Sequence, residues 1–195
     1  LTMLGTISLG AILGIMAGYF RGITEEVIMR VVDVMLSFPS QIMVFAVVAL
    51  LGVSVQNVII ANVFIKWAWS ARMIRTGVMQ YRDCNFVRFS RCVGMPERFI
   101  LFRHLLPSIT SDLVVLASLD VGWAIINIST LSFLGLGVQA PTPEWGAMLN
   151  EAKNVMTSSP VQMIAPGVAI VVLVCVFNLM GDAMRDVLDP KEVQK

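Results

Sequence analysis

Long apolar stretches alternate along this chain with short polar segments. A helix needs about 20 mainly apolar residues to cross a hydrocarbon core of roughly 30 Å. Five stretches come near this length, and we expect each to be a membrane span: residues 1–20, 34–52, 53–71, 109 to about 134, and 166–180. The pattern therefore predicts an all-α protein, a polytopic transmembrane helical bundle.

Two features refine the first three spans. The second and third stretches are separated only by a tight turn, which predicts a helical hairpin, and the second is expected to extend back through Arg30 and Asp33, a pair within one helix. In the first stretch Gly10, Gly14 and Gly18 recur at four-residue spacing. Small residues on one stripe let membrane helices approach closely, so we expect a packed interface there, although glycine is also common in membrane helices generally.

Composition excludes a soluble globule. Hydrophobic residues make up 57% of the chain and charged residues 14%, against roughly 45–50% and about 25% in soluble domains. The formal net charge of +1 gives no indication of a nucleic-acid partner, and none is expected. The chain opens at Leu1 inside an apolar run, without the features of a signal peptide, so we expect upstream sequence to be missing.

The distribution of charge predicts the orientation. Half of the 14 Lys and Arg residues lie between Arg72 and Arg103, and an excess of basic residues marks cytoplasmic loops. The long opposite loop, residues 135–165, has Lys153 as its only basic residue and is expected to be extracytoplasmic. In a five-span arrangement the cytoplasmic side also holds the other basic residues near span ends: Arg21, Arg185, Lys191 and Lys195.

The cytoplasmic loop, residues 72–107, has the pattern of two short amphipathic helices. Phe86, Phe89 and Val93 recur at helical spacing in the first helix, which Gly94 is expected to end. Pro96 is expected to start the second helix, because proline is tolerated in the first turn, and Pro107 to close it. Ordered apolar faces on both sides of a bend favour docking into a groove of another protein. The alternative is a basic loop that lies on anionic lipid headgroups.

Residues 86–94 with 103–107 resemble the EAA loop of bacterial ABC importer permeases, in which a glycine precedes a Leu-Pro pair at a fixed interval; here these are Gly94 and Leu106-Pro107. Residues 132–137, 141–146 and 181–186 are more specifically similar to the dipeptide, oligopeptide and nickel permease group. The chain departs from the family pattern at Arg88-Phe89-Ser90, where the family carries Glu-Ala-Ala. The residues expected in the ATPase-docking loop are Phe86, Arg88, Phe89, Arg91, Gly94, Met95, Pro96, Arg103, His104 and Pro107.

The resemblance implies one permease domain over residues 1–195, with six spans in a full-length chain of which the first is missing here. It implies a bacterial or archaeal cytoplasmic membrane and four kinds of partner: a second homologous permease, two cytoplasmic ATPase subunits, an extracytoplasmic solute-binding protein and membrane lipid. The implied cargo is nickel, free or chelated, or a dipeptide or oligopeptide. The run 66–72 resembles the nickel members more closely.

No motif indicates chemistry within the chain. A phosphate-cradling Gly-x-x-x-x-Gly-Lys-Ser/Thr run is absent from the sequence, so ATP hydrolysis is expected in a separate subunit. Zinc-protease and nucleophile-turn motifs are also absent. We therefore expect no catalytic, cofactor or metal site, and lone His104 is a poor nickel ligand.

Three polar residues inside predicted spans are candidates for the translocation path: Asn62, Asp120 and Asn127. A carboxylate deep in a bilayer is costly unless it faces water or a partner, and a buried structural aspartate is the alternative. On the outer side, Glu144 and Trp145 are candidates for contact with the binding protein, unless Trp145 only anchors the chain at the membrane interface. Two further alternatives stay open: an intramembrane aspartyl protease using Asp120 and Asp182, and a passive channel.

Overall fold

The computed structural model describes residues 1–138 and 141–188. This part of the chain is helical and contains no strand, which confirms the all-α class. The helices are α1 Thr2–Tyr19, α2 Ile23–Ser37, α3 Ser40–Leu51, α4 Val55–Arg82, α5 Asn85–Cys92, α6 Glu97–Ile100, a π-helical turn Leu101–Leu105, α7 Leu106–Phe133, α8 Trp145–Ala152, a 3-10 turn Lys153–Val155, and α9 Val161–Leu188.

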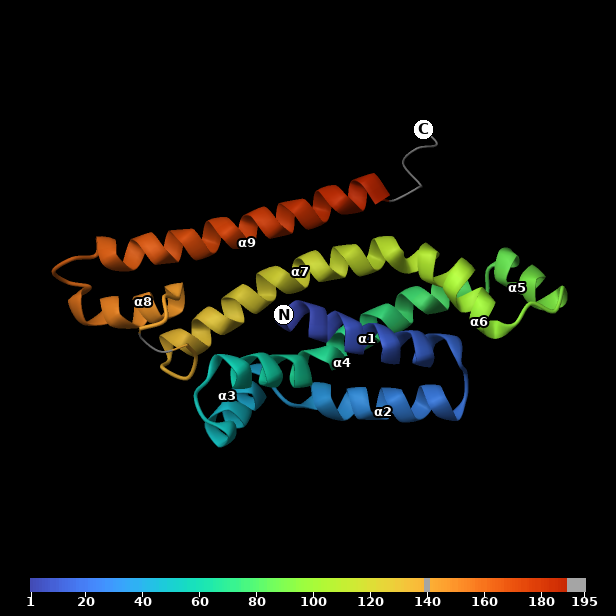
Figure 1. The fold of residues 1–195 in the computed structure, drawn as a ribbon, viewed down its shortest axis with the longest axis horizontal. Helices are drawn as coiled ribbons and strands as arrows, with labels where there is room; N and C mark the ends of the chain where they lie inside the picture. Colours follow the sequence, from blue (N-terminus) through green and yellow to red (C-terminus); the bar gives the residue numbers. More distant parts are fainter. Residues whose placement is uncertain (139–140, 189–195) are drawn as a thin grey trace.

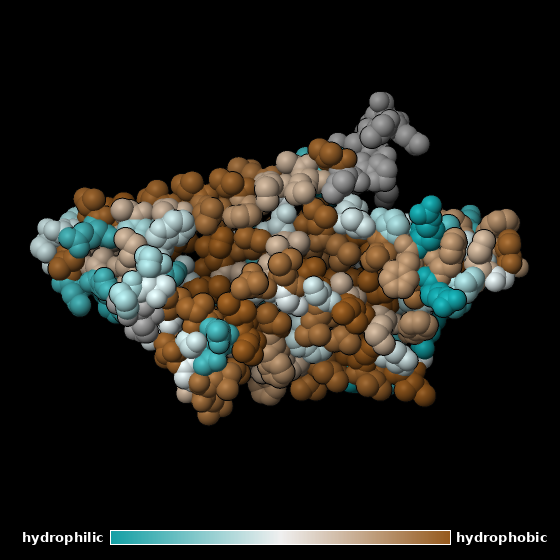
Figure 2. Space-filling view, in the orientation of Figure 1, coloured by the Kyte–Doolittle hydropathy of each residue, from teal (hydrophilic) through white to brown (hydrophobic). Residues whose placement is uncertain are grey.

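The long helices run roughly along one axis of an elongated bundle, with the two long connections at opposite ends (Figure 1). Helices α5 and α6 project at one end, and α8 lies at the other. Hydrophilic side chains gather at these two ends, whereas hydrophobic side chains cover most of the middle (Figure 2). This distribution is the one expected of a bundle whose middle lies in lipid.

Among the described residues three helical segments are long and apolar enough to span a membrane on their own: Thr2–Tyr19, Glu97–Phe133 and Val161–Val187. Helices α2 and α3 make a fourth if counted together. Helix α4, which contains the third expected span, has sufficient length at 28 residues but is less apolar. Helix α4 is central in the bundle, in contact with α1, α2, α3 and α7, so polar side chains such as Asn62 and Ser70 are buried against neighbouring helices.

The expectation of one uninterrupted second span over residues 34–52 is wrong. Helix α2 ends at Ser37, α3 starts at Ser40, and the two axes differ by 85°. Pro39 accounts for the break, because a proline disfavours helical geometry in the preceding residue and has no N–H to donate. Phe38 is accordingly extended, with φ −97° and ψ 142°.

The predicted glycine interface is confirmed. Helix α1 packs on α4 along its glycine stripe, so closely that a Cβ added at Gly10 would lie 2.6 Å from the Ser70 Cβ. A Cβ at Gly14 would lie 2.6 Å from the Ala71 carbonyl oxygen. The two backbones approach this closely only because glycine has no side chain.

The loop that we expect to be cytoplasmic is shorter than predicted. Helix α4 continues through Arg82, so the loop starts at Asp83 rather than at residue 72. The expectation that Pro107 closes a separate helix is also wrong, because α6, the π turn and α7 form one continuous segment in which Pro107 is the second residue of α7. The wider π turn just before it accommodates a proline ring that would otherwise clash with the carbonyl four residues earlier.

Candidate docking loop and membrane-embedded polar residues

Helix α5 has its predicted apolar stripe on the outside of the molecule. Val87 and Ser90 face inward and are buried. Phe86, Phe89 and Val93 are 41%, 70% and 59% exposed, so a large part of each side chain is left uncovered by the described residues. A short helix at the end of the bundle that buries Val87 and Ser90 and exposes two phenylalanines has an apolar face available for a partner.

Gly94 forms the bend that the sequence predicts. Its φ of +81° lies in the left-handed region that favours glycine. The Gly94 N–H donates to the Arg91 carbonyl and the Met95 N–H to the Ser90 carbonyl, each at 3.0 Å. This pair of bonds is a Schellman motif, which satisfies the last carbonyls of α5 and turns the chain toward Pro96.

The second half of the loop buries some of its apolar side chains in the core of the bundle and exposes others. Ile100 and Leu105 are buried in the core, whereas Phe99 and Phe102 are 40% and 72% exposed. The half-buried His104 ring lies 6.2 Å from the ring of Phe86 and 5.7 Å from that of Phe99, measured between centroids. His104 therefore joins α5 to the second segment by ring packing, and the described residues contain no metal-binding cluster around it.

The other residues predicted for the docking loop also lie at this end. All of them are exposed: Arg88, Arg91, Gly94, Met95, Pro96, Arg103 and Pro107. Together with Phe86, Phe89, Val93, Phe99 and Phe102 they make a surface that is apolar at its centre and basic around it, hereafter the loop surface. Such a mixture suits a protein partner, since interfaces combine aromatic anchors with a polar rim.

Asp120 has a partner that the sequence analysis missed. Its carboxylate lies 3.5 Å from the Lys66 Nζ, with side-chain exposures of 1% and 11%. The Lys66 ammonium also lies 3.8 Å from the ring centroid of Trp123 and 4.5 Å from that of Trp69. A signal was available, because Lys66 is the one cation within the predicted span 53–71, and a buried carboxylate needs a counter-charge.

The two candidate asparagines are buried in the same helices as this ion pair. Asn62 on α4 is 0% exposed and Asn127 on α7 is 1% exposed. The Asn62 Nδ2 donates to the Val58 carbonyl at 2.8 Å, while the Oδ1 atoms of both asparagines have no partner among the described residues. Helices α4 and α7 thus carry buried polar groups inside an apolar bundle.

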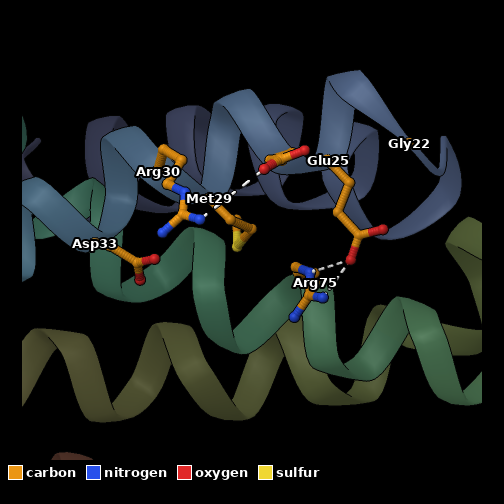
Figure 3. A pocket seen from close by; sticks show the side chains of 7 residues that line it. Gly22, Glu25, Met29, Arg30, Asp33 and Arg75 are labelled. Atoms are coloured by element: carbon orange, nitrogen blue, oxygen red, sulfur yellow. Dashed lines mark hydrogen bonds and ion pairs between the residues drawn. The ribbon is translucent and has the colours of Figure 1, made fainter.

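A pocket between α2 and α4 contains charges to which the sequence analysis gave no site role (Figure 3). Arg75 donates to the Glu25 carboxylate across it. The predicted pairing of Arg30 with Asp33 is wrong: Arg30 lies 3.9 Å from Glu26, and Asp33 pairs with Arg72. The acidic side of α2 therefore faces the basic end of α4.

On the opposite end, Glu144 has a structural role. As the N-cap of α8 it accepts a hydrogen bond from the Ala147 N–H at 2.8 Å and another from the Ser129 hydroxyl at 3.0 Å. Its carboxylate ties α8 to α7, since a side-chain acceptor at an N-cap satisfies free N–H groups of the first turn. Trp145 remains 37% exposed and is the more available of the two candidate contact residues.

Comparison with known proteins agrees with this geometry. The family model described as "Binding-protein-dependent transport system inner membrane component" matches residues 10–194. The chain is 46% identical over 167 residues to the metal-staphylopine import system permease protein CntC of Staphylococcus aureus, covering 86% of this chain and 58% of CntC. It is 43% identical over 183 residues to the glutathione transport system permease protein GsiD of Pectobacterium atrosepticum, covering 94% and 61%.

The nickel transport system permease protein NikC of Escherichia coli is 43% identical over 188 residues, with coverage of 96% and 68%. The chain thus spans about three fifths of the length of the first relatives it matches. Among solved structures, inward-facing MetNI methionine ABC transporter gives a TM-score of 0.80 at 16% identity, covering 96% of this chain and 89% of that one. This likeness establishes the fold.

Proposed function

Because this chain belongs to the family of binding-protein-dependent transport system inner membrane components, we propose that it is the permease subunit of an ATP-driven importer. In this role the chain contributes the membrane pathway. The hydrolysis of ATP takes place on a separate cytoplasmic subunit, in keeping with the absence of a phosphate-cradling motif from the sequence.

The observation that carries the proposal is the loop surface. It combines exposed apolar side chains, foremost Phe89 at 70% and Phe102 at 72% exposure, with several arginines at one end of a bundle whose middle is apolar. Such a surface is too basic for the membrane interior and too apolar to remain in water without a partner. An ATPase subunit that binds there can move the bend at Gly94, and the helices that continue from it.

The partners of the proposed importer are two ATPase subunits, a second homologous permease and an extracytoplasmic solute-binding protein. Support for the binding protein comes from the family's own description. We place its contact at Trp145, beside the cap formed by Glu144. We place the translocation path along α4 and α7, where Asn62, Asp120 and Asn127 are buried; the path requires these helices to part during the transport cycle.

The cargo that we propose is nickel, as the free ion or as a chelate, with a dipeptide or oligopeptide as the alternative. The similar permeases carry names that refer to nickel, metal-staphylopine and glutathione. An uptake assay with radioactive nickel ion set against a radiolabelled dipeptide, in cells with and without this gene, separates the two. ATP-independent flux of either would favour the passive channel instead.

The aspartyl protease alternative has little support. Asp120 is buried against Lys66, whereas Asp182 is exposed on α9. Paired catalytic carboxylates must share a proton at close range, and a lysine that neutralises one of them works against that arrangement. Retained transport in an Asp120→Asn, Asp182→Asn variant would exclude the protease.

Docking is tested by a charge placed on the loop surface. Phe89→Asp introduces a carboxylate at a 70% exposed position, so folding of the bundle is preserved while the apolar contact is lost. We expect co-purification of the ATPase subunit to fall at least about tenfold, as for loss of an aromatic anchor at an interface. The matched control is Val187→Asp, at an 83% exposed position near the end of α9. Unchanged co-purification in Phe89→Asp would contradict the proposal.

A further inference from the structure

The last residue of α1 contacts the cytoplasmic loop directly. Tyr19 is 4% exposed, and its hydroxyl donates a hydrogen bond to the Glu97 carboxylate. The guanidinium of Arg91 lies 5.1 Å from the centroid of the Tyr19 ring, and its Nε lies 3.5 Å from the Glu97 Oε1. Each of the three side chains thus touches the other two. We call Tyr19, Arg91 and Glu97 the Tyr19 clasp.

The clasp joins parts of the chain that are far apart in sequence. Tyr19 and Glu97 are separated by 78 positions, and Arg91 and Glu97 stand on either side of the bend at Gly94. The Tyr19 ring also belongs to the same buried cluster as Val87 and Ile100 of the loop. The side chain of Tyr19 therefore packs against residues of both loop helices, at the end of the bundle from which α5 and α6 project (Figure 1).

A second contact holds the same helix end. Arg82, the last residue of α4, is only 3% exposed and donates from Nη1 to the Gly18 carbonyl at 2.6 Å. The last carbonyls of a helix lack partners within the helix, and a cation there also interacts favourably with the helix dipole. The final turn of α1 is thus fixed by the end of α4 and by the loop bend.

From these contacts we infer that α1 moves with the cytoplasmic loop as one body, and that Tyr19 is the positioning residue that transmits loop displacement to α1. The inference rests on the proposed importer function. It adds a second route from loop to membrane: the first is the covalent continuation of the loop into α4 and α7, and the second is the clasp. Without the clasp, the end of α1 would be held to the loop only through its packing on α4 and the Arg82–Gly18 contact, so less of the displacement of the bend would reach it.

The inference is tested in the complete transporter, with its partner subunits, reconstituted in lipid vesicles. The readout is the number of ATP molecules hydrolysed per solute imported, with nickel ion or a dipeptide as the solute, whichever the unaltered transporter takes up. Tyr19→Phe removes only the hydroxyl and keeps the ring beneath Arg91. We expect it to raise this ratio about threefold, the size of a modest coupling energy, with unchanged ATPase co-purification.

Rescue distinguishes transmission from simple packing. Arg91→Glu and Glu97→Arg each place two like charges across the bend and should also raise the ratio. The double variant restores an ion pair beside the Tyr19 hydroxyl, and we expect it to return most of the way to the original ratio. The control is Arg21→Ala. Arg21 also joins the α1 end to the loop, through Asp83 at 2.8 Å, but this pair is exposed and is expected to contribute little.

Two results would overturn the inference. One is an unchanged ratio in Tyr19→Phe, whether or not this variant assembles normally, and the other is failure of the double variant to improve on the single ones. Failure of the proposed function has a different signature, because the unaltered transporter would then show no ATP-dependent uptake.

Discussion

Lys66 and Asp120 form an ion pair where charges are most expensive. A single ion buried in a low-dielectric interior costs several kcal/mol even after relaxation, and the loss is offset only by a well-placed opposite charge. The Lys66 ammonium contacts the Asp120 carboxylate and the rings of Trp69 and Trp123. The face of an aromatic ring attracts a cation, and the attraction is stronger when the cation is desolvated. The pair therefore links α4 to α7 in one register.

This arrangement predicts a specific pattern of stability. Lys66→Met alone leaves a buried carboxylate without its partner, and Asp120→Asn alone leaves a buried ammonium. Breaking a buried pair from one side costs about 3–5 kcal/mol, so both single variants should have a clearly lower thermal midpoint in the detergent-purified transporter. The double variant removes both charges and should recover most of that loss. Singles that match the unaltered protein would show that the pair is not buried.

The sequence alone predicts the bend at Gly94, but it does not predict which buried polar side chains contact one another. Gly94 followed by Pro96 signals a helix end and a new start, and the structure has both. Glu144, whose contact with the binding protein stays a prediction, also caps α8 and accepts a hydrogen bond from Ser129. Glutamate is not a preferred N-cap residue, and the Ser129 contact crosses between two helices, so spacing along the chain did not reveal it.

The close packing of helix α1 on helix α4 depends on the glycines of α1. A Cβ at Gly14 would lie 2.6 Å from the Ala71 carbonyl oxygen and 3.0 Å from the Ile74 Cβ. We expect Gly14→Ala to push the two helices apart and to destabilise the bundle by about 1–3 kcal/mol, as for other overpacked sites. The measurement is again the thermal midpoint of the purified transporter.

The chain offers a matched control for this change. Gly167 on α9 has nothing within 4 Å of an added Cβ, so Gly167→Ala introduces the same methyl group into a membrane helix without a clash. It should leave the midpoint unchanged or raise it slightly, because alanine favours a helix over glycine. A Gly14→Ala variant as stable as Gly167→Ala would disprove the close packing.

Apolar runs located the membrane helices but not their ends. Helix α4 extends through Arg82, well beyond the apolar part of its sequence. Its last turns are held by burial, because Ile74 and Val78 pack against α1 and Arg82 donates to the Gly18 carbonyl. Arg72 and Arg75 add pairs with Asp33 and Glu25 of α2. These contacts are tertiary, whereas hydropathy depends on each segment by itself. The break at Pro39, in contrast, has a local cause in the sequence, because a proline disfavours helical geometry in the residue before it.

At the scale of the whole molecule, the charge distribution was the most informative signal. The basic loop and the long opposite loop lie at opposite ends of the bundle, as the alternation of charge predicted (Figure 1). Helix α9 needs a covering from outside this chain, because only 6% of its most apolar stretch is buried by the described residues; lipid or a second subunit has to supply it.

Two natural cysteines probe this arrangement without foreign residues. Cys92 and Cys175 are both exposed, but Cys92 ends α5 in the loop, whereas Cys175 lies midway along apolar α9. A membrane-impermeant maleimide needs water and a thiolate, so it should label Cys92 in inside-out vesicles and not in intact cells. Cys175, facing lipid or a second permease, should stay unlabelled in both. A Cys84→Ser background leaves Cys92 as the single loop thiol.

Binding of the ATPase is also expected to change the rate at which Cys92 is labelled. Cys92 directly precedes Val93 on the loop surface, so an ATPase docked there should slow its labelling in inside-out vesicles, and removal of the ATPase by urea washing should restore it. Labelling of Cys92 from the outside of intact cells would show that the bundle has the opposite orientation. The loop surface would then be inaccessible to a cytoplasmic ATPase subunit, and the proposed docking would be contradicted. If Cys92 in inside-out vesicles is labelled equally fast with and without the ATPase, the orientation is correct but the ATPase does not cover this face of α5.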